Sequence, residues 1–372
     1  MKPVFRAPGT EAILGCLSFL LPLVFAPCSL PGSDADPRAA PVPPAGASIR
    51  DPRIVDHMHG FDEFLSSLDR QADAALLRRA YRRHFAALDA DVYRQFVGDL
   101  DRFSDQFLER VSGLLARHRE DIREYTELAR VQIPEATRDA QEAFGASLAG
   151  VPQYITLNLL QSNAQVRLVD GAVTIVYGMD SNAVMEPLVF PDTPRDLRVT
   201  VAHELFHAHH WSVNSFMAEW APRFLPPRAD APMWINLWSE GLASCASRHV
   251  YPDAKIAHVL SFEGIWEQAQ PRLAELTRGL VEVLDATDPE TTARWLYIQL
   301  PERTDGLPNK AGYIVATVAA HRIVAEHGLE AATALAGDEL RETFESAIAA
   351  LADGEPLPDT RNLCQPNSGA KE

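Results

Sequence analysis

The chain has 372 residues, of which 47% are hydrophobic and 23% are charged, so it can form one large core or two domains. Its 34 Lys and Arg residues against 51 Asp and Glu give a net charge of −17. That balance argues against a nucleic acid partner, because neutralising phosphates needs a cationic surface. Only one stretch is apolar enough to be considered as a membrane segment, and it lies at the N-terminus. This excludes a polytopic transporter.

The first 28 residues have the pattern of a signal peptide, with a basic start and an uncharged apolar run at 12–25. Two processing routes stay open. Ala26 and Cys28 suit an ordinary cleavage site, whereas Cys28 is also placed to be the acylated first residue of a lipoprotein, although Pro27 fits that signal poorly. We therefore expect an exported protein, located in the periplasm, anchored to the outer membrane through lipidated Cys28, or secreted.

Residues 29–50 are rich in proline and alanine and are interpreted as a tether, because this composition tends to polyproline II and does not pack. Beyond Cys28, the mature chain carries Cys245 and Cys364. Two options remain for this pair in an oxidising compartment. Either it forms a disulfide that fixes the C-terminal tail (356–372), or Cys245 is a buried thiol and Cys364 is free.

Residues 51–150 are predicted to form a helical N-terminal subdomain. One long amphipathic helix is predicted from apolar residues that recur at three- and four-residue steps, namely Phe96, Leu100, Phe103, Phe107, Val111 and Leu114. A shorter helix is predicted to begin at Phe61. His57 and His59, close to the tether, are interpreted as surface residues.

The pattern changes after Gly150 to segments rich in β-forming residues, at 154–159, 165–169 and 172–177. Asp170-Gly171 between the last two segments predicts a two-residue hairpin turn. We therefore predict a small antiparallel sheet, followed by helices at 194–210, 233–248, 271–284 and 310–326. The predicted fold class is α+β and predominantly helical, with the main domain at 151–355.

The main domain contains the motif His203-Glu204-Leu205-Phe206-His207, which has the form HExxH. Its helix is predicted to begin at Thr193-Pro194, with Asp196 completing a capping box. Residues i and i+4 share one face of a helix, so His203 and His207 can bind one metal ion while Glu204 projects beside them. A catalytic zinc site of this kind needs a third protein ligand and keeps its fourth position for water.

Glu240 is the candidate third ligand because it is a lone acid in the apolar run 233–244. A buried, unpaired carboxylate is costly unless a cation compensates it, although a partly exposed surface acid is the alternative interpretation. Glu219 is the nearest rival, but it follows His207 too closely for the chain to return on a second helix. Val213 stands where a metzincin needs its third histidine, which sets that class aside.

HExxH followed by Trp238-Ser239-Glu240-Gly241-Leu242-Ala243 resembles the gluzincin metallopeptidases, and in particular bacterial proteins described as predicted zinc-dependent proteases. The resemblance covers roughly residues 154–326 and implies a zincin-like catalytic domain. It also implies one zinc ion per chain, bound by His203, His207 and Glu240, and a general base, Glu204. In the thermolysin branch an acid four residues after the ligand glutamate orients a histidine, but here that position is Ser244, so the orienting group must lie elsewhere.

Gluzincins also present an edge strand to the substrate and a late Tyr or His donor to the reacting carbonyl. By this resemblance, residues 172–177 are expected to form the edge strand. Tyr313 is the expected donor, with His321 in reserve.

We therefore expect an exported zinc metallopeptidase that acts on a peptide or protein. Hydrolysis of a non-peptide amide stays open within the same chemistry. The alternative is an exported or lipid-anchored binding or scaffold protein whose metal site is structural or vestigial. Chelation distinguishes the two, since a peptidase loses activity but keeps its fold, whereas a structural site collapses.

Overall fold

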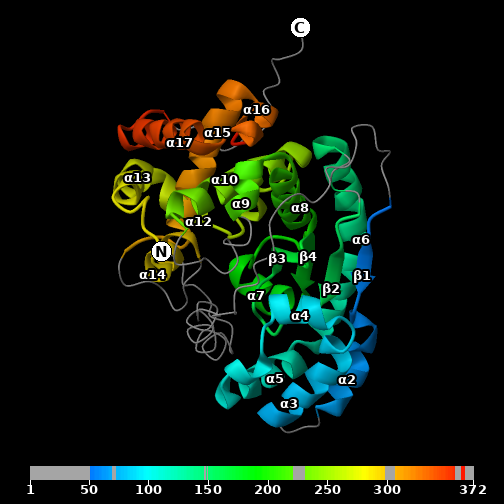
Figure 1. The fold of residues 1–372 in the computed structure, drawn as a ribbon. Coiled ribbons are helices and arrows are strands. Elements are labelled where there is room, and N and C mark those ends of the chain that lie inside the picture. Colours follow the sequence, from blue (N-terminus) through cyan, green and yellow to red (C-terminus); the bar gives the residue numbers. More distant parts are fainter. Residues whose placement is uncertain are drawn as a thin grey trace.

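The computed structural model describes residues 51–68, 73–145, 148, 150–220, 231–297, 306–356 and 362–364, and the predicted leader and tether lie outside this part of the chain. The described residues are predominantly helical around one four-stranded sheet, so the α+β prediction is confirmed (Figure 1). The first half comprises β1 (Ile54–Asp56), α2 (Phe61–Ser67), α3 (Ala74–Tyr81), α4 (Ala90–Phe96), α5 (Asp105–Arg117), α6 (Arg119–Phe144), β2 (Gln153–Thr156), β3 (Ala164–Val169) and β4 (Ala172–Gly178). The second half comprises α7 (Met179–Val189), α8 (Arg198–Val213), α9 (Ser215–Trp220), α10 (Met233–Val250), α11 (Ile256–Val259), α12 (Ile265–Ala269), α13 (Leu273–Val281), α14 (Pro289–Leu296), α15 (Ala311–His327), α16 (Leu329–Ala334) and α17 (Gly337–Ala352).

The sheet has the strand order β1-β2-β4-β3 and is mixed. The predicted hairpin is present, because β3 and β4 pair antiparallel around Asp170 and Gly171, both of which have positive φ. The prediction of an antiparallel sheet is wrong for the rest, since β1, β2 and β4 run parallel. Residues 172–177 are also not an edge strand, because β4 pairs on both sides, with β2 and with β3. The edge strands are β1 and β3, and β3 contacts α8.

The predicted long helix through residues 96–114 is broken in the structure. Helix α4 ends at Phe96, Gly98 adopts φ +78, and a short 3-10 turn at Leu100–Arg102 precedes α5. Ser104 then caps α5 by accepting a hydrogen bond from the backbone N–H of Phe107. All six apolar residues of this stripe are nevertheless buried, so the periodicity predicted their burial correctly. The helix boundaries depend instead on the Ser104 cap and on the positive φ of Gly98.

The segment before α2 contributes a strand that the sequence did not predict. β1 extends the sheet by parallel pairing with β2. His57, which follows it, is only 9% exposed, and its Nδ1 lies 3.0 Å from the hydroxyl of Tyr93, so its interpretation as a surface residue is wrong. The two predicted units, 51–150 and 151–355, therefore share one sheet, and a continuous cluster of buried side chains connects them.

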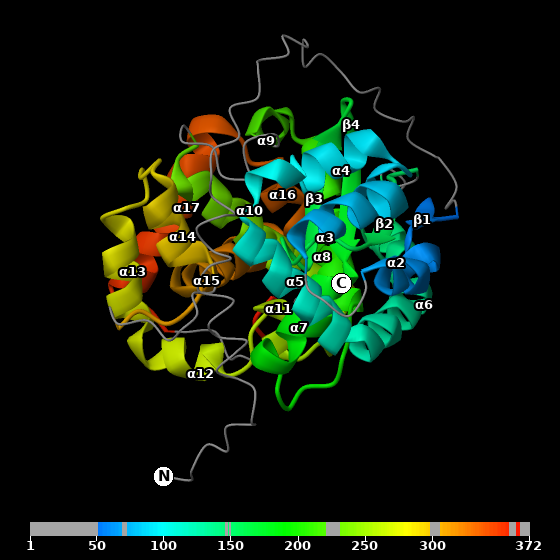
Figure 2. The same ribbon diagram turned by 90° about the horizontal axis from the view of Figure 1, so that it is seen from below.

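Three helices carry the region where the predicted site residues lie. Helix α8 packs against the sheet strands β3 and β4 and against α6, and α10 lies between α8 and α15. Figures 1 and 2 show α13, α14 and α17 on the side of α10 and α15 that is remote from the sheet. Gly241 allows the close approach of α10 to α15, since a Cβ atom there would lie 2.6 Å from the carbonyl carbon of Ala316.

The boundaries of these helices agree with the sequence except at the start of α8. That helix begins at Arg198, not at Thr193-Pro194. Asp196 accepts a hydrogen bond from the backbone N–H of Arg198 and pairs with its guanidinium. Asp196 therefore lies just before the first turn of the helix and not inside it, as the capping-box prediction required. The predicted helices at 233–248 and 310–326 correspond to α10 and α15.

The C-terminal residues 362–364 are joined to the helical core by a disulfide between Cys245 on α10 and Cys364, with a Cα–Cα distance of 4.5 Å. The guanidinium of Arg248 also donates to the carbonyl oxygen of Leu363. Of the two options left open by the sequence, the structure shows the disulfide. Within the described ranges, no helix combines the length and the apolar character needed to cross a membrane.

Candidate metal centre

Helix α8 presents His203 and His207 from one face, one turn apart. Their Nε2 atoms lie 3.1 Å from each other, and their side chains are 12% and 9% exposed. Two neutral imidazole nitrogens cannot approach this closely with both lone pairs facing unless a proton or a cation lies between them. The HExxH spacing therefore produces the converging pair that the sequence predicts.

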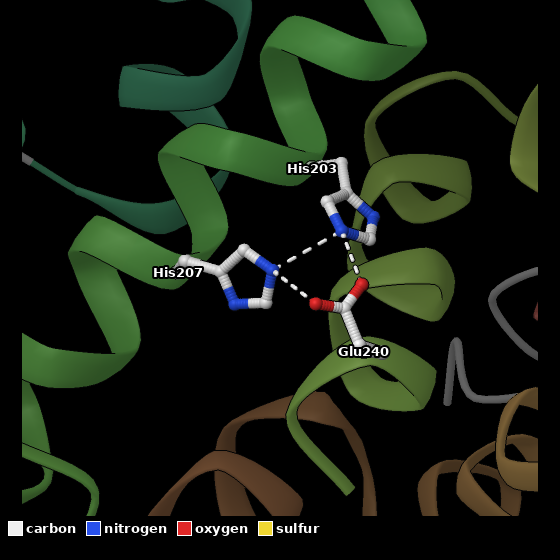
Figure 3. A group of neighbouring side chains, drawn as sticks. All are labelled: His203, His207 and Glu240. Carbon is white, nitrogen blue, oxygen red and sulfur yellow. Dashed lines mark hydrogen bonds and ion pairs between the residues drawn. The ribbon is translucent and has the colours of Figure 1, made fainter. Parts of the chain in front are cut away.

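Helix α10 brings Glu240 to the same point from the opposite side (Figure 3). One carboxylate oxygen lies 3.2 Å from His203 Nε2, and the other lies 3.7 Å from His207 Nε2. Among the described residues, His203, His207 and Glu240 form a group whose ligand atoms all lie within 4.8 Å of one another. The rival Glu219 is exposed on α9 and does not belong to this group.

The spacing between the two imidazole nitrogens and the two oxygens of Glu240 fits a small divalent cation. Two ligands about 2.1 Å from a tetrahedral zinc ion are about 3.4 Å apart. The distance of 3.1 Å between the nitrogens, and the distances of 3.2 and 3.7 Å from each nitrogen to a different Glu240 oxygen, lie on both sides of that value. Two imidazole nitrogens and one carboxylate oxygen are also the donor set typical of a catalytic zinc site. The Glu240 side chain is 34% exposed, which leaves this side of the site open.

Electrostatics favour the metal-binding protonation states of His207 and Glu240. Burial lowers the pKa of His207 to about 4, so its imidazole is neutral at neutral pH. Burial by itself would raise the pKa of Glu240, but the hydrogen bond from His203 and the nearby positive charges outweigh it and lower that pKa to about 2. Metal ligands must be deprotonated, so this arrangement is prepared for a cation.

The pKa of Glu204 is shifted in the opposite direction from that of Glu240. Burial raises the pKa of its carboxyl group to about 7, an effect that the charge of His203 opposes and that of Glu240 reinforces. A carboxylate with a pKa near neutrality exchanges protons efficiently at physiological pH. Two carboxylates with separated pKa values suit two roles, with Glu240 as a permanent anion and Glu204 as a proton acceptor.

The group that orients His207 is a serine. Ser239 is buried, and its Oγ lies 3.1 Å from His207 Nδ1. When Nε2 faces a cation, Nδ1 carries the proton and donates it to this hydroxyl, which fixes both the tautomer and the ring plane. Ser239 was not predicted from the sequence, because a carboxylate was expected to orient the ligand histidines. The available signal was its place as a small polar residue beside Glu240 in an otherwise apolar run.

Tyr313 reaches the site from α15. Its ring lies nearly parallel to that of His203, with an interplanar angle of 16° and 6.4 Å between centroids. Its hydroxyl accepts a hydrogen bond of 2.7 Å from Ser244, which stands one turn after Glu240 on α10. Ser244 therefore places the phenol instead of orienting a histidine. The reserve donor His321 lies elsewhere, where its Nδ1 accepts a hydrogen bond from the backbone N–H of Cys364.

Lys310, which was not predicted as a site residue, also lies in this region. Only 8% of it is exposed, and its Nζ is 3.6 Å from the centroid of the Tyr313 ring. Burial lowers the pKa of its ammonium group to about 8, while the charge of Glu240 opposes that shift. The sequence did offer a signal, since the chain contains four lysines, at positions 2, 255, 310 and 371, among its 34 basic residues.

Comparison of the chain with family models, curated proteins and solved structures finds no match. The assignment of a function therefore depends on the geometry of the site and on the resemblance of its motifs.

Proposed function

We propose that this protein is a zinc-dependent hydrolase, and specifically an exported metallopeptidase. The observation that carries the proposal is the convergence of His203, His207 and Glu240 within 4.8 Å, with Glu204 beside them on α8. His203, His207 and Glu240 would hold the ion. A zinc ion bound there supplies a Lewis acid for the substrate carbonyl and lowers the pKa of a bound water to ~7.

The side chains around the ligands have complementary roles in hydrolysis. Glu204 accepts the proton of the attacking water and transfers it to the leaving amine, which its pKa of about 7 permits in both directions. Tyr313 donates its phenolic hydrogen to the oxyanion of the tetrahedral intermediate. Burial raises the pKa of Tyr313, so the phenol stays protonated and available as a donor.

The sheet supports a peptide as the substrate. β3 is one of its two edge strands and contacts α8, so an extended peptide added along β3 would lie close to the helix that carries His203 and His207. This assignment of the substrate also depends on the gluzincin resemblance of the motifs. The Cys245–Cys364 disulfide supports export, because such bonds persist in oxidising compartments.

The test compares purified wild-type protein with Glu204→Gln and, as a matched control, with Glu219→Gln on the exposed surface of α9. We expect about one zinc per chain in all three proteins. Hydrolysis of casein and of quenched peptides should fall at least about 10³-fold in Glu204→Gln alone, because the remaining site lacks its proton acceptor.

Chelation separates this proposal from a binding or scaffold function. The wild-type protein should lose hydrolysis on treatment with a chelator and retain its circular dichroism spectrum. Zinc binding without hydrolysis of any peptide, together with unfolding on chelation, would favour a structural metal. Near-wild-type turnover by Glu204→Gln would contradict the assigned mechanism.

A further inference from the structure

Lys310 is buried, and its backbone conformation gives no reason for a lysine at this position. It stands at the N-cap of α15 with φ 54 and ψ 30, a left-handed conformation that glycine or asparagine adopts more easily. Lys255, the other described lysine, is exposed. Buried ammonium groups are costly to desolvate, so a lysine in this position indicates a role for its side chain.

The Lys310 ammonium group makes two contacts that join the start of α15 to the rest of the site. It donates a hydrogen bond of 3.0 Å to the carbonyl oxygen of Leu260. It also lies 3.6 Å from the centroid of the Tyr313 ring, within the range of a cation–π interaction. A desolvated contact of this kind is stronger than an exposed one, so it restricts how the ring can move.

The opposite end of the Tyr313 side chain is held by α10. Ser244 donates a hydrogen bond of 2.7 Å to the phenolic oxygen. Glu240 and Ser244 stand at positions i and i+4, so they share one face of α10. The hydroxyl of Tyr313 is thereby held against the face of α10 that carries Glu240. The ammonium of Lys310 covers one face of the Tyr313 ring, and Ser244 holds its hydroxyl.

We propose that Lys310 is a positioning residue, whose ammonium group clamps the Tyr313 ring so that the phenol points at the reacting carbonyl beside His203, His207 and Glu240. This inference rests on the proposed hydrolase function. It goes beyond that function by assigning a task to a residue outside the ligand set and outside the proton-transfer chemistry.

The first experiment measures kcat and KM of the zinc-loaded, full-length protein for a cleaved peptide. It compares the wild type, Lys310→Met, Tyr313→Phe and the double variant, with Lys255→Met as the control for loss of a lysine. We expect Lys310→Met to lower kcat about 10- to 100-fold with KM and zinc content nearly unchanged, because a displaced donor acts only in the transition state. In the Tyr313→Phe background the same substitution should cost less than about twofold, since the phenol is already absent.

Equal losses in both backgrounds would overturn the proposal, because Lys310 would then act independently of Tyr313. Unchanged kcat in Lys310→Met would overturn it as well. The melting temperature gives a separate readout. Replacing a buried charge by methionine should leave it equal or higher, whereas a clear decrease would show that Lys310 stabilises the fold instead of positioning a side chain.

A crystal structure tests the position of Tyr313 even if no peptide is hydrolysed. In a crystal structure of Lys310→Met, the Tyr313 hydroxyl should have left hydrogen-bond distance of Ser244 Oγ. An unchanged contact would overturn the clamp. If Lys310→Met does not fold, Lys310→Gln is examined in the same way. Absence of hydrolysis by the wild type refutes the proposed function, while the Tyr313 position alone decides whether Lys310 holds it.

Discussion

The orientation of the His207 ring depends on its hydrogen bond with the hydroxyl of Ser239. Metal affinity is sensitive to such partners, because they fix the tautomer and the plane of the ligand ring. We expect Ser239→Ala to weaken zinc binding about 10- to 100-fold and to leave the fold intact. Competition with a chromogenic chelator measures this change.

Ser247→Ala is the matched control for that substitution. Ser247 is also a buried serine of α10, but its hydroxyl donates to the backbone carbonyl of Ser244 and does not contact a proposed ligand. Its replacement should leave zinc affinity unchanged. Equal zinc affinities for Ser239→Ala and the wild type would show that the hydroxyl does not orient His207.

At the scale of single residues, the sequence predicted the convergence of His203, His207 and Glu240, because part of it follows from helical geometry. His203 and His207 share a helix face at a fixed spacing, and Glu240 was recognisable as a lone acid among apolar neighbours. Ser239 and Lys310 were not predicted. Their roles depend on contacts between elements, and in sequence a serine or a lysine has no spacing that marks such a contact.

The approach of α10 to α15 is the contact between elements that most constrains the chain, because Gly241 lies against the α15 backbone. An added methyl group at that position would overlap the Ala316 carbonyl, and a backbone cannot move aside as a flexible side chain does. We expect Gly241→Ala to lower the free energy of unfolding by about 3 kcal/mol or more. Urea denaturation followed by circular dichroism measures the loss.

Gly113 on α5 provides the control for Gly241. It is exposed, and a Cβ built there meets no atom within 4 Å. Gly113→Ala should therefore raise the free energy of unfolding by about 0.5–1 kcal/mol, because alanine is the better helix former. A destabilisation of the same size at both glycines would show that helix packing at Gly241 is not the cause.

At the scale of elements, the periodicity predicted which residues are buried better than it predicted where helices end. The stripe from Phe96 to Leu114 is buried, yet it spans two helices, because Gly98 takes a conformation that a helix does not allow. β1 escaped prediction for a related reason. Three residues are too short for a recognisable alternation, and the strand exists through pairing with β2, which lies about a hundred residues later.

The metal-free protein as a whole should lose stability in mild acid. Burial lowers the pKa values of His207 and His209 to about 4 and that of His210 to about 3. Burial lowers the pKa of His321 to about 4 as well. In the unfolded chain these imidazoles titrate near 6.5, so between about pH 4 and 6.5 the unfolded state binds more protons and is favoured as the pH falls.

The raised pKa values of Glu204, Asp180 and Glu186 oppose this trend, since burial makes these three carboxyl groups bind protons earlier in the folded state than in the unfolded one. The four histidines outnumber them, so the free energy of unfolding should fall from pH 7 to pH 5. Each net proton taken up on unfolding contributes about 1.4 kcal/mol per pH unit. Urea titrations of metal-free protein at several pH values test this, and constant stability over the range would contradict it.

The disulfide contributes to stability at the same scale, because it joins residues 119 positions apart in sequence. Closing so long a loop removes much conformational freedom from the unfolded chain. We expect reduction, or the double substitution Cys245→Ala and Cys364→Ala, to lower the free energy of unfolding by about 2–5 kcal/mol. Identical urea midpoints for oxidised and reduced protein would count against the bond as a stabilising element.

The same covalent link has a practical consequence for handling the protein. It closes a ring of backbone that carries α11 to α17. A single nick anywhere inside that ring leaves both pieces attached, and they separate on a gel only after a thiol reductant is added. Self-digestion of a stored sample would therefore escape notice on a non-reducing gel, where a nicked chain migrates close to an intact one.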